Sequence, residues 1–141
     1  MGRRKKSRIR DYAVAAFEKY AAIGCPTREE YENIIREEIY RNFELSEPKV
    51  ILMKVESELL KKKPLLEDLE AIARMIRTLE NTKKDYILEA VKNIYFTSES
   101  RSMKYRVISY SAEHYTDERS VYRWLRYARE LFAYYRGLTL S

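Results

Sequence analysis

The chain has 141 residues, of which 35% are charged and 45% are hydrophobic, and its formal net charge is +6. This balance excludes a disordered polyelectrolyte, and no apolar tract reaches the length of about 18 residues that a membrane-spanning helix needs. Three glycines and three prolines are too few for a sheet with many hairpins, whereas the Glu-, Lys-, Arg- and Leu-rich tracts favour helices. We therefore expect an all-α protein. A single cysteine cannot form an internal disulfide, so a reducing, cytoplasmic compartment is expected.

The charge is distributed unevenly along the chain. Residues 1–10 contain six basic and no acidic residues, residues 11–100 contain 14 basic and 18 acidic residues, and residues 101–141 contain eight basic and four acidic residues. The three segments thus carry +6, −4 and +4. A polyanionic partner would meet the two ends of the chain rather than its middle. The alternative is that the basic residues form only a solubilising tail and a solvated helix face.

Apolar residues spaced three and four apart predict helices over residues 8–22 and 28–43. Gly24 and Pro26 end the first of these helices. Thr27, with Glu30 three residues later, forms a capping-box signature for the second.

The middle of the chain continues this helical pattern. Ser46 is a predicted N-cap for a third helix that carries Pro48 in its first turn. An apolar stripe runs from Val50 to Leu79, and Pro64 either breaks or kinks the helix that carries it. This stripe pairs either with another part of the same chain or with a second chain, which leaves a homo-oligomer open.

Residues 97–102 contain no large apolar residue and form the clearest linker in the sequence. A boundary at this point predicts three parts. They are a basic flexible arm over residues 1–10, a helical assembly or interaction region over residues 11–97, and a helix-turn-helix DNA-binding unit over residues 98–141.

The C-terminal part contains a short predicted helix over residues 103–114 and then a longer one. Asp117 is a good N-cap for the longer helix, and Gly137 ends it. Its predicted buried side consists of Val121, Trp124, Leu125, Ala128, Leu131 and Phe132.

A short helix, a tight turn and a longer basic helix are typical of a helix-turn-helix unit, whose second helix enters the major groove of DNA. Arginine pairs with guanine, glutamate accepts a hydrogen bond from cytosine, and tyrosine and serine reach phosphates or bases. In the arm, the basic side chains are candidates for phosphate or minor-groove contacts. The candidate DNA-binding residues are Glu118, Arg119, Ser120, Tyr122, Arg123 and Arg126, with Arg3, Arg4, Lys5 and Lys6 in the arm.

The segment Asp117–Leu125, which reads Asp-Glu-Arg-Ser-Val-Tyr-Arg-Trp-Leu, resembles the recognition helix of sigma-factor region 4. Its continuation through Phe132 keeps the same pattern, although Trp124 is bulkier than the usual aliphatic residue. With its basic start and acidic helical middle, the chain resembles the small phage regulators of the RinA/ArpU type. This resemblance implies a regulator of late or lysis genes in phages and prophages of Gram-positive bacteria.

These observations predict a sequence-specific transcriptional regulator that binds double-stranded DNA, with RNA polymerase as a further partner. The alternatives are a small-terminase-like DNA-packaging protein of a phage, and a helical protein–protein interaction module without nucleic acid. We expect no enzyme activity, metal, cofactor or membrane partner. His114 and Cys25 lack partners at metal-binding spacing, and there is no glycine-rich phosphate loop.

Overall fold

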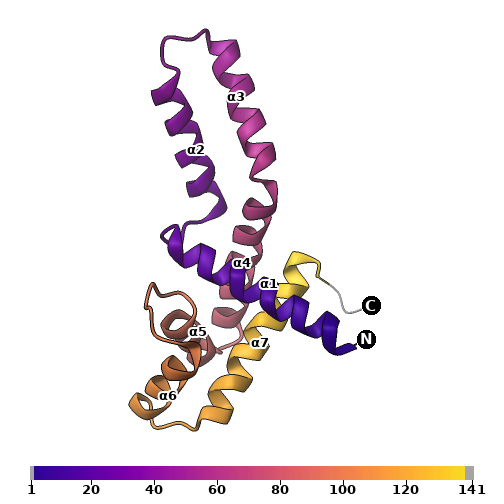
Figure 1. Ribbon diagram of the computed structural model, residues 1–141, viewed down its shortest axis with the longest axis vertical. Coiled ribbons are helices and arrows are strands. Elements are labelled where there is room, and N and C mark those ends of the chain that lie inside the picture. The colour runs from indigo at the N-terminus through magenta and orange to yellow at the C-terminus, as the bar shows by residue number, and fades with distance from the viewer. Residues whose placement is uncertain (1, 139–141) are drawn as a thin grey trace. The chain divides into compact units, whose positions relative to one another are not determined.

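The computed structural model describes the backbone of residues 2–138 and the side chains of residues 7–138. Every regular element in this part of the chain is an α-helix, which confirms the all-α prediction (Figure 1). In chain order the helices are α1 (Gly2–Ala22), α2 (Arg28–Asn42), α3 (Pro48–Lys61), α4 (Lys63–Asn81), α5 (Asp85–Ile94), α6 (Met103–Glu113) and α7 (Glu118–Arg136).

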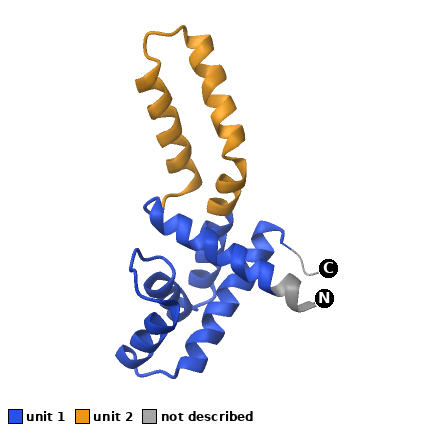
Figure 2. Cartoon of the chain, in the orientation of Figure 1, with its two compact units in different colours: residues 1–25, 71–141 blue, residues 26–70 orange. Residues whose placement is uncertain are grey.

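The chain divides into two compact units that do not follow the predicted parts (Figure 2). The first unit combines Met1–Cys25 with Ala71–Ser141, and the second is Pro26–Glu70. The boundary predicted at residues 97–102 lies inside the first unit, so the predicted separation of the C-terminal helices from all earlier ones is wrong. The physical reason is that α1, from the start of the chain, packs against α7, from its end.

Phe17 of α1 lies at the centre of the first unit's core. Its side chain is fully buried, and its ring centroid lies 5.2 Å from those of Tyr95 and Phe132 and 5.6 Å from that of Phe96. α7 also packs against α5 and α6, so these contacts join α1, α5, α6 and α7. In α4, Thr78 is hydrogen-bonded to the Tyr135 hydroxyl at 2.5 Å.

The N-terminal residues do not form a separate arm. α1 begins at Gly2, so residues 2–10 of the segment predicted as flexible, residues 1–10, supply the first turns of a helix that continues to Ala22. Residues 3–10 contain neither glycine nor proline, and arginine and lysine are good helix formers. The prediction of a flexible arm is therefore wrong. The side chains of Arg3, Arg4, Lys5 and Lys6 lie outside the described residues.

The second unit is built on a hairpin in which α2 and α3 run side by side in opposite directions (Figure 1). The predicted capping box at the start of α2 is confirmed. The Thr27 amide donates to Glu30 Oε1 at 3.3 Å, and the Glu30 amide donates to Thr27 Oγ1 at 3.1 Å. Two otherwise unpaired amides are thereby satisfied, so the start of α2 is defined by local sequence.

The two prolines of the middle region mark helix starts. Pro48 is the first residue of α3, but the N-cap is Glu47, without a side-chain hydrogen bond, rather than the predicted Ser46. Pro64 is the second residue of α4, after an interruption at Lys62. Proline is tolerated there because the amide of a residue in the first helical turn has no partner within the helix. The helix is therefore broken before Pro64 rather than kinked at it.

We expect Phe17→Ala to lower the free energy of unfolding by about 3–5 kcal/mol, because the vacated space lies between several buried rings. Urea denaturation followed by circular dichroism measures this change. Lys104→Ala, on the exposed side of α6, is the control and should change stability by less than about 0.5 kcal/mol. A loss as small as that of the control would show that α1 is not part of the core.

Candidate nucleic-acid interface

α6 and α7 are contacting helices joined by a short connection, residues 114–117. Ser102 caps α6, as its side chain accepts a hydrogen bond from the Tyr105 amide. Tyr115 has a φ of 52°, in the left-handed region that non-glycine residues adopt infrequently. Gly137 ends α7 with a φ of 82°, as predicted. This order of helices and caps places the start of α7 directly after a tight turn.

Asp117 caps the start of α7, as predicted. Its carboxylate accepts hydrogen bonds from the Ser120 amide at 2.7 Å and from the Ser120 hydroxyl at 3.0 Å. These hydrogen bonds lower the pKa of Asp117, so the cap is ionised at neutral pH next to the positive end of the helix. Ser120 is half-buried and its hydroxyl donates to the Asp117 carboxylate, whereas the other candidate contact residues of α7 are exposed.

One side of α7 is buried and the other carries an arginine stripe. The buried residues are Val121, Leu125, Ala128, Phe132 and Ala133, whereas Trp124 and Leu131 of the predicted set are only half-buried. On the opposite side, Arg119, Arg123 and Arg126 follow one another at spacings of four and three, which places them on one helix face. We call these three residues the arginine stripe. All three are exposed, as are Glu118 and Tyr122.

Within the stripe, Arg123 donates to the Ser120 hydroxyl at 3.4 Å, whereas Arg129 and Arg106 bind groups of the first unit's interior. Arg129 Nη1 donates to the Tyr95 hydroxyl at 2.7 Å. Burial raises the pKa of Tyr95, whereas the charge of Arg129 and its hydrogen bond act in the opposite direction. The Tyr95 hydroxyl is therefore neutral at physiological pH and anchors Arg129 to the core of the first unit.

Arg106 holds the segment that the sequence indicated as a linker. Its guanidinium donates to three backbone carbonyls, those of Ile94 at 2.7 Å, Arg101 at 2.8 Å and Glu99 at 3.2 Å. The segment after α5 is thus fastened to α6. The sequence did not predict this role of Arg106, because no spacing or motif distinguishes an arginine that binds backbone carbonyls from the other arginines of the C-terminal helices.

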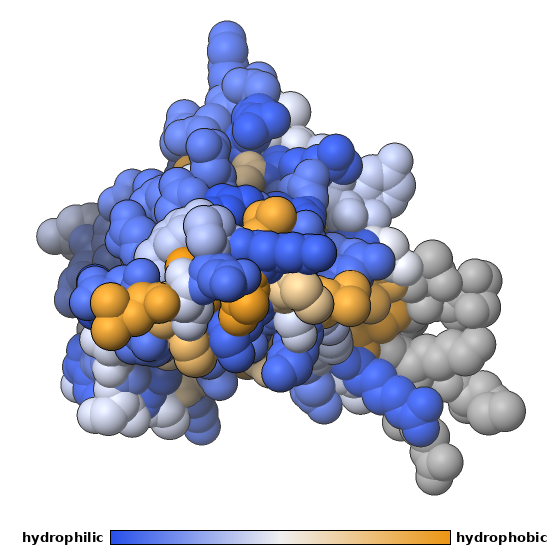
Figure 3. Space-filling view, turned by 90° about the horizontal axis from the view of Figure 1, so that it is seen from above, coloured by the Kyte–Doolittle hydropathy of each residue, from blue (hydrophilic) through white to orange (hydrophobic). Residues whose placement is uncertain are grey.

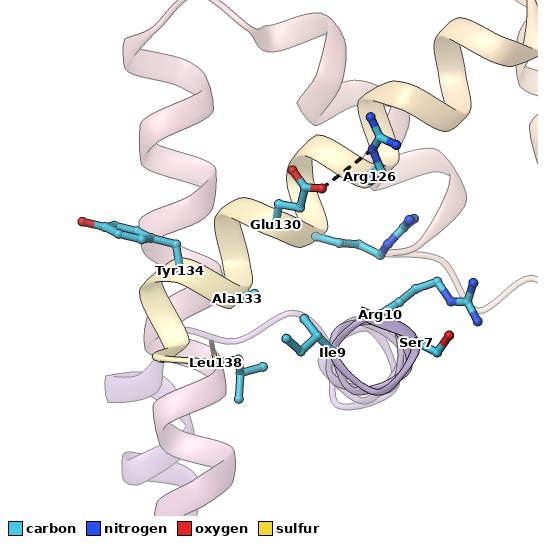
Figure 4. A pocket seen from close by; sticks show the side chains of 9 residues that line it. Ser7, Ile9, Arg10, Arg126, Glu130, Ala133, Tyr134 and Leu138 are labelled. Atoms are coloured by element: carbon cyan, nitrogen blue, oxygen red, sulfur yellow. Dashed lines mark ion pairs between the residues drawn. The ribbon is translucent and has the colours of Figure 1, made fainter. Parts of the chain in front are cut away.

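The basic part of α1 meets α7 at an open pocket of about 520 Å³ (Figure 4). Arg10 of α1 and Arg126 and Arg129 of α7 line it, together with the apolar side chains of Ile9 and Leu138. Glu130 partly offsets this charge, since its Oε1 lies 3.7 Å from Arg126 Nε, but both of these side chains are exposed. The structure thus brings basic residues from both ends of the chain to one surface.

His114 and Cys25 have structural surroundings. The His114 ring stacks on Tyr110 at a centroid distance of 3.9 Å, its Nδ1 lies 3.0 Å from the Tyr110 carbonyl, and its Nε2 lies 3.7 Å from Glu89. Cys25 is exposed. Within residues 7–138, no three histidine, cysteine or acidic side chains are grouped so that they could hold a metal ion. No helix of the described residues combines the length and apolar character needed to cross a membrane.

The chain matches no family model, no curated protein and no solved structure.

We expect Arg106→Ala to accelerate trypsin cleavage after Arg101, because the chain around Glu99 and Arg101 loses its hydrogen-bond donor. The free energy of unfolding should fall by about 1–3 kcal/mol, since two part-buried carbonyls, those of Ile94 and Glu99, and the exposed carbonyl of Arg101 lose a charged donor. Arg106→Lys retains the charge but not the planar fork, and should give an intermediate cleavage rate. Lys104→Ala is the neighbouring control. Identical cleavage rates in all variants would contradict this role.

Proposed function

We propose that this protein binds double-stranded DNA in a sequence-specific manner through α7 and regulates transcription. The observation that carries this proposal is the exposed arginine stripe of Arg119, Arg123 and Arg126 on a capped helix that follows a short turn. The resemblance of Asp117–Leu125 to a sigma-factor region 4 recognition helix points to the same class of function.

The distribution of charge between the two compact units supports a polyanionic partner for the first unit. Met1–Cys25 and Ala71–Ser141 together contain 20 basic and 10 acidic residues, a net charge of +10. Pro26–Glu70 contains eight basic and 12 acidic residues, a net charge of −4. The unit that carries the arginine stripe thus has more positive charge than the whole chain, and a DNA backbone is attracted by it.

In this proposal the first turns of α7 enter the major groove, which is wide enough for one α-helix. Arg119 and Arg123 reach base edges, and Glu118 and Tyr122 contact bases or phosphates beside them. Arg126, one turn further along, contacts the phosphate backbone. Arg10, which lines the pocket beside Arg126, adds a phosphate contact from α1.

The acidic second unit is the part of the chain that we propose for contacts with proteins, including RNA polymerase. Its net charge of −4 disfavours contact with phosphates. A small-terminase-like DNA-packaging protein would also need DNA binding and a helical assembly region. Unlike a transcriptional regulator, it would assemble into a ring of many subunits.

Selection of bound sequences from a random duplex pool tests this function, together with a titration of duplex DNA at low and raised salt. We expect enrichment of a short common sequence and an affinity that falls with salt. Each phosphate contact should contribute about 0.9 to the slope of log affinity against log salt concentration. Absent binding, or binding indifferent to salt, would reject a DNA-binding role and favour a helical interaction module.

We expect Arg123→Ala to weaken binding to the selected duplex by about 1–3 kcal/mol and binding to a random duplex much less, because a base contact is lost. Competition titrations measure both affinities. Arg74→Ala, an exposed arginine of α4 in the same unit, is the matched control and should leave the difference between the two duplexes unchanged. Equal losses on both duplexes for Arg123→Ala would mean that Arg123 contacts only phosphate.

A further inference from the structure

α3 is apolar on two sides, and α2 covers only one of them. Ile51 and Val55 are buried in the hairpin, where α3 packs against α2. Leu52, Met53 and Leu60 are exposed, at 56%, 61% and 72% of their surface. Figure 3, which views the molecule from above, shows hydrophobic side chains at the surface among hydrophilic ones. A helix that is apolar on both sides is normally covered on both.

Leu52, Met53 and Leu60 lie on one face of α3, together with Lys49 and Glu56. With a turn of about 100° per residue, these five residues occupy a sector of about 100° that points away from Ile51 and Val55. We call this sector the outer face of α3, and it consists of Lys49, Leu52, Met53, Glu56 and Leu60. Leu45, in the turn before α3, is 98% exposed as well.

The two charged residues of the outer face are placed symmetrically about its apolar centre. Lys49 and Glu56 are seven residues apart, with Leu52 and Met53 between them. Both are exposed, and neither forms an ion pair with another described residue. Reversing the direction of the helix exchanges the positions of the positive and the negative charge. The outer face is therefore complementary to an antiparallel copy of itself.

We propose that the outer face of α3 binds the same face of a second copy of this chain, in an antiparallel pair with twofold symmetry. In this pair Leu52 lies opposite the partner's Met53, and Lys49 lies opposite the partner's Glu56. A twofold interface uses one patch twice, so every one of these pairings occurs twice.

The charges on the outer face favour a second copy over an unrelated helix. A uniformly acidic helix would leave Glu56 opposed by like charge, and a uniformly basic helix would do the same to Lys49. An antiparallel copy pairs both charges and covers the leucines and the methionine with side chains of the same kind. This inference does not depend on DNA binding, because it rests on residues of the second unit alone.

Sedimentation equilibrium of the full chain tests the proposal. The wild-type protein should show a mass of about twice the 17.0 kDa of one chain. Lys49→Glu and Glu56→Lys should each raise the dimer dissociation constant about tenfold or more, since each change places like charges together twice. Lys61→Glu is the matched control. It makes the same charge change on an exposed residue of α3 outside the outer face, and should leave the dissociation constant within about twofold.

The pairing itself is tested by mixing the two single variants. Each variant should be weakly associated alone, and an equal mixture should recover the wild-type dimer affinity, because every opposed pair is again of opposite charge. The double variant Lys49→Glu/Glu56→Lys should recover it as well. Circular dichroism should show unchanged helicity, since both substituted side chains are exposed.

A wild-type monomer at all concentrations, a ring of many subunits, or single variants that associate normally would overturn the proposal. So would a mixture that fails to recover affinity. The DNA titration described above, repeated with Glu56→Lys, keeps the two proposals separate. If Glu56→Lys no longer dimerises but still binds DNA at a single site, the dimer proposal is supported. If the wild-type protein neither dimerises nor binds DNA, the dimer proposal and the DNA-binding proposal are both rejected.

Discussion

The contact of Phe17 with Phe132 and Tyr95 is the interaction on which the first unit depends. It joins the first helix of the chain to the last and brings α5 into the same aromatic cluster. Because Phe132 lies on the same side of α7 as Val121, Leu125 and Ala128, burying this side turns the opposite side towards solvent. The exposure of Arg119, Arg123 and Arg126 is therefore a consequence of core packing.

The same contact decides where the positive charge gathers. Counted along the chain, the charge is basic at both ends and acidic in between. Counted by compact unit, the first unit carries +10 and the second −4, since α1 and α7 belong together. The arginines of the first unit then serve different purposes. Arg106 and Arg129 hold backbone carbonyls and a buried tyrosine, whereas the side chains of the arginine stripe are exposed.

The second unit shows a different physical constraint. Two antiparallel helices share one seam, and Ile35, Ile51 and Val55 are buried there. α3 has more apolar residues than this seam can cover, so Leu52, Met53 and Leu60 remain at the surface. Lys49 and Glu56 on this surface exchange places when the helix is reversed, and this symmetry is the basis on which we propose a second copy of the chain as its partner.

The sequence by itself determined the helical class, most helix limits and the main caps of this protein. Thr27, Asp117 and Gly137 act where local spacing placed them, because a cap involves only residues three or four apart. The buried side of α7 was likewise largely predictable, since helical periodicity is a local property. Only the tertiary structure decided that the basic N-terminus continues a helix packed on α7, that the units divide at Pro26 and Glu70, and that Arg106 and Arg129 are structural. These features depend on contacts between residues distant in sequence, and no local spacing encodes such contacts.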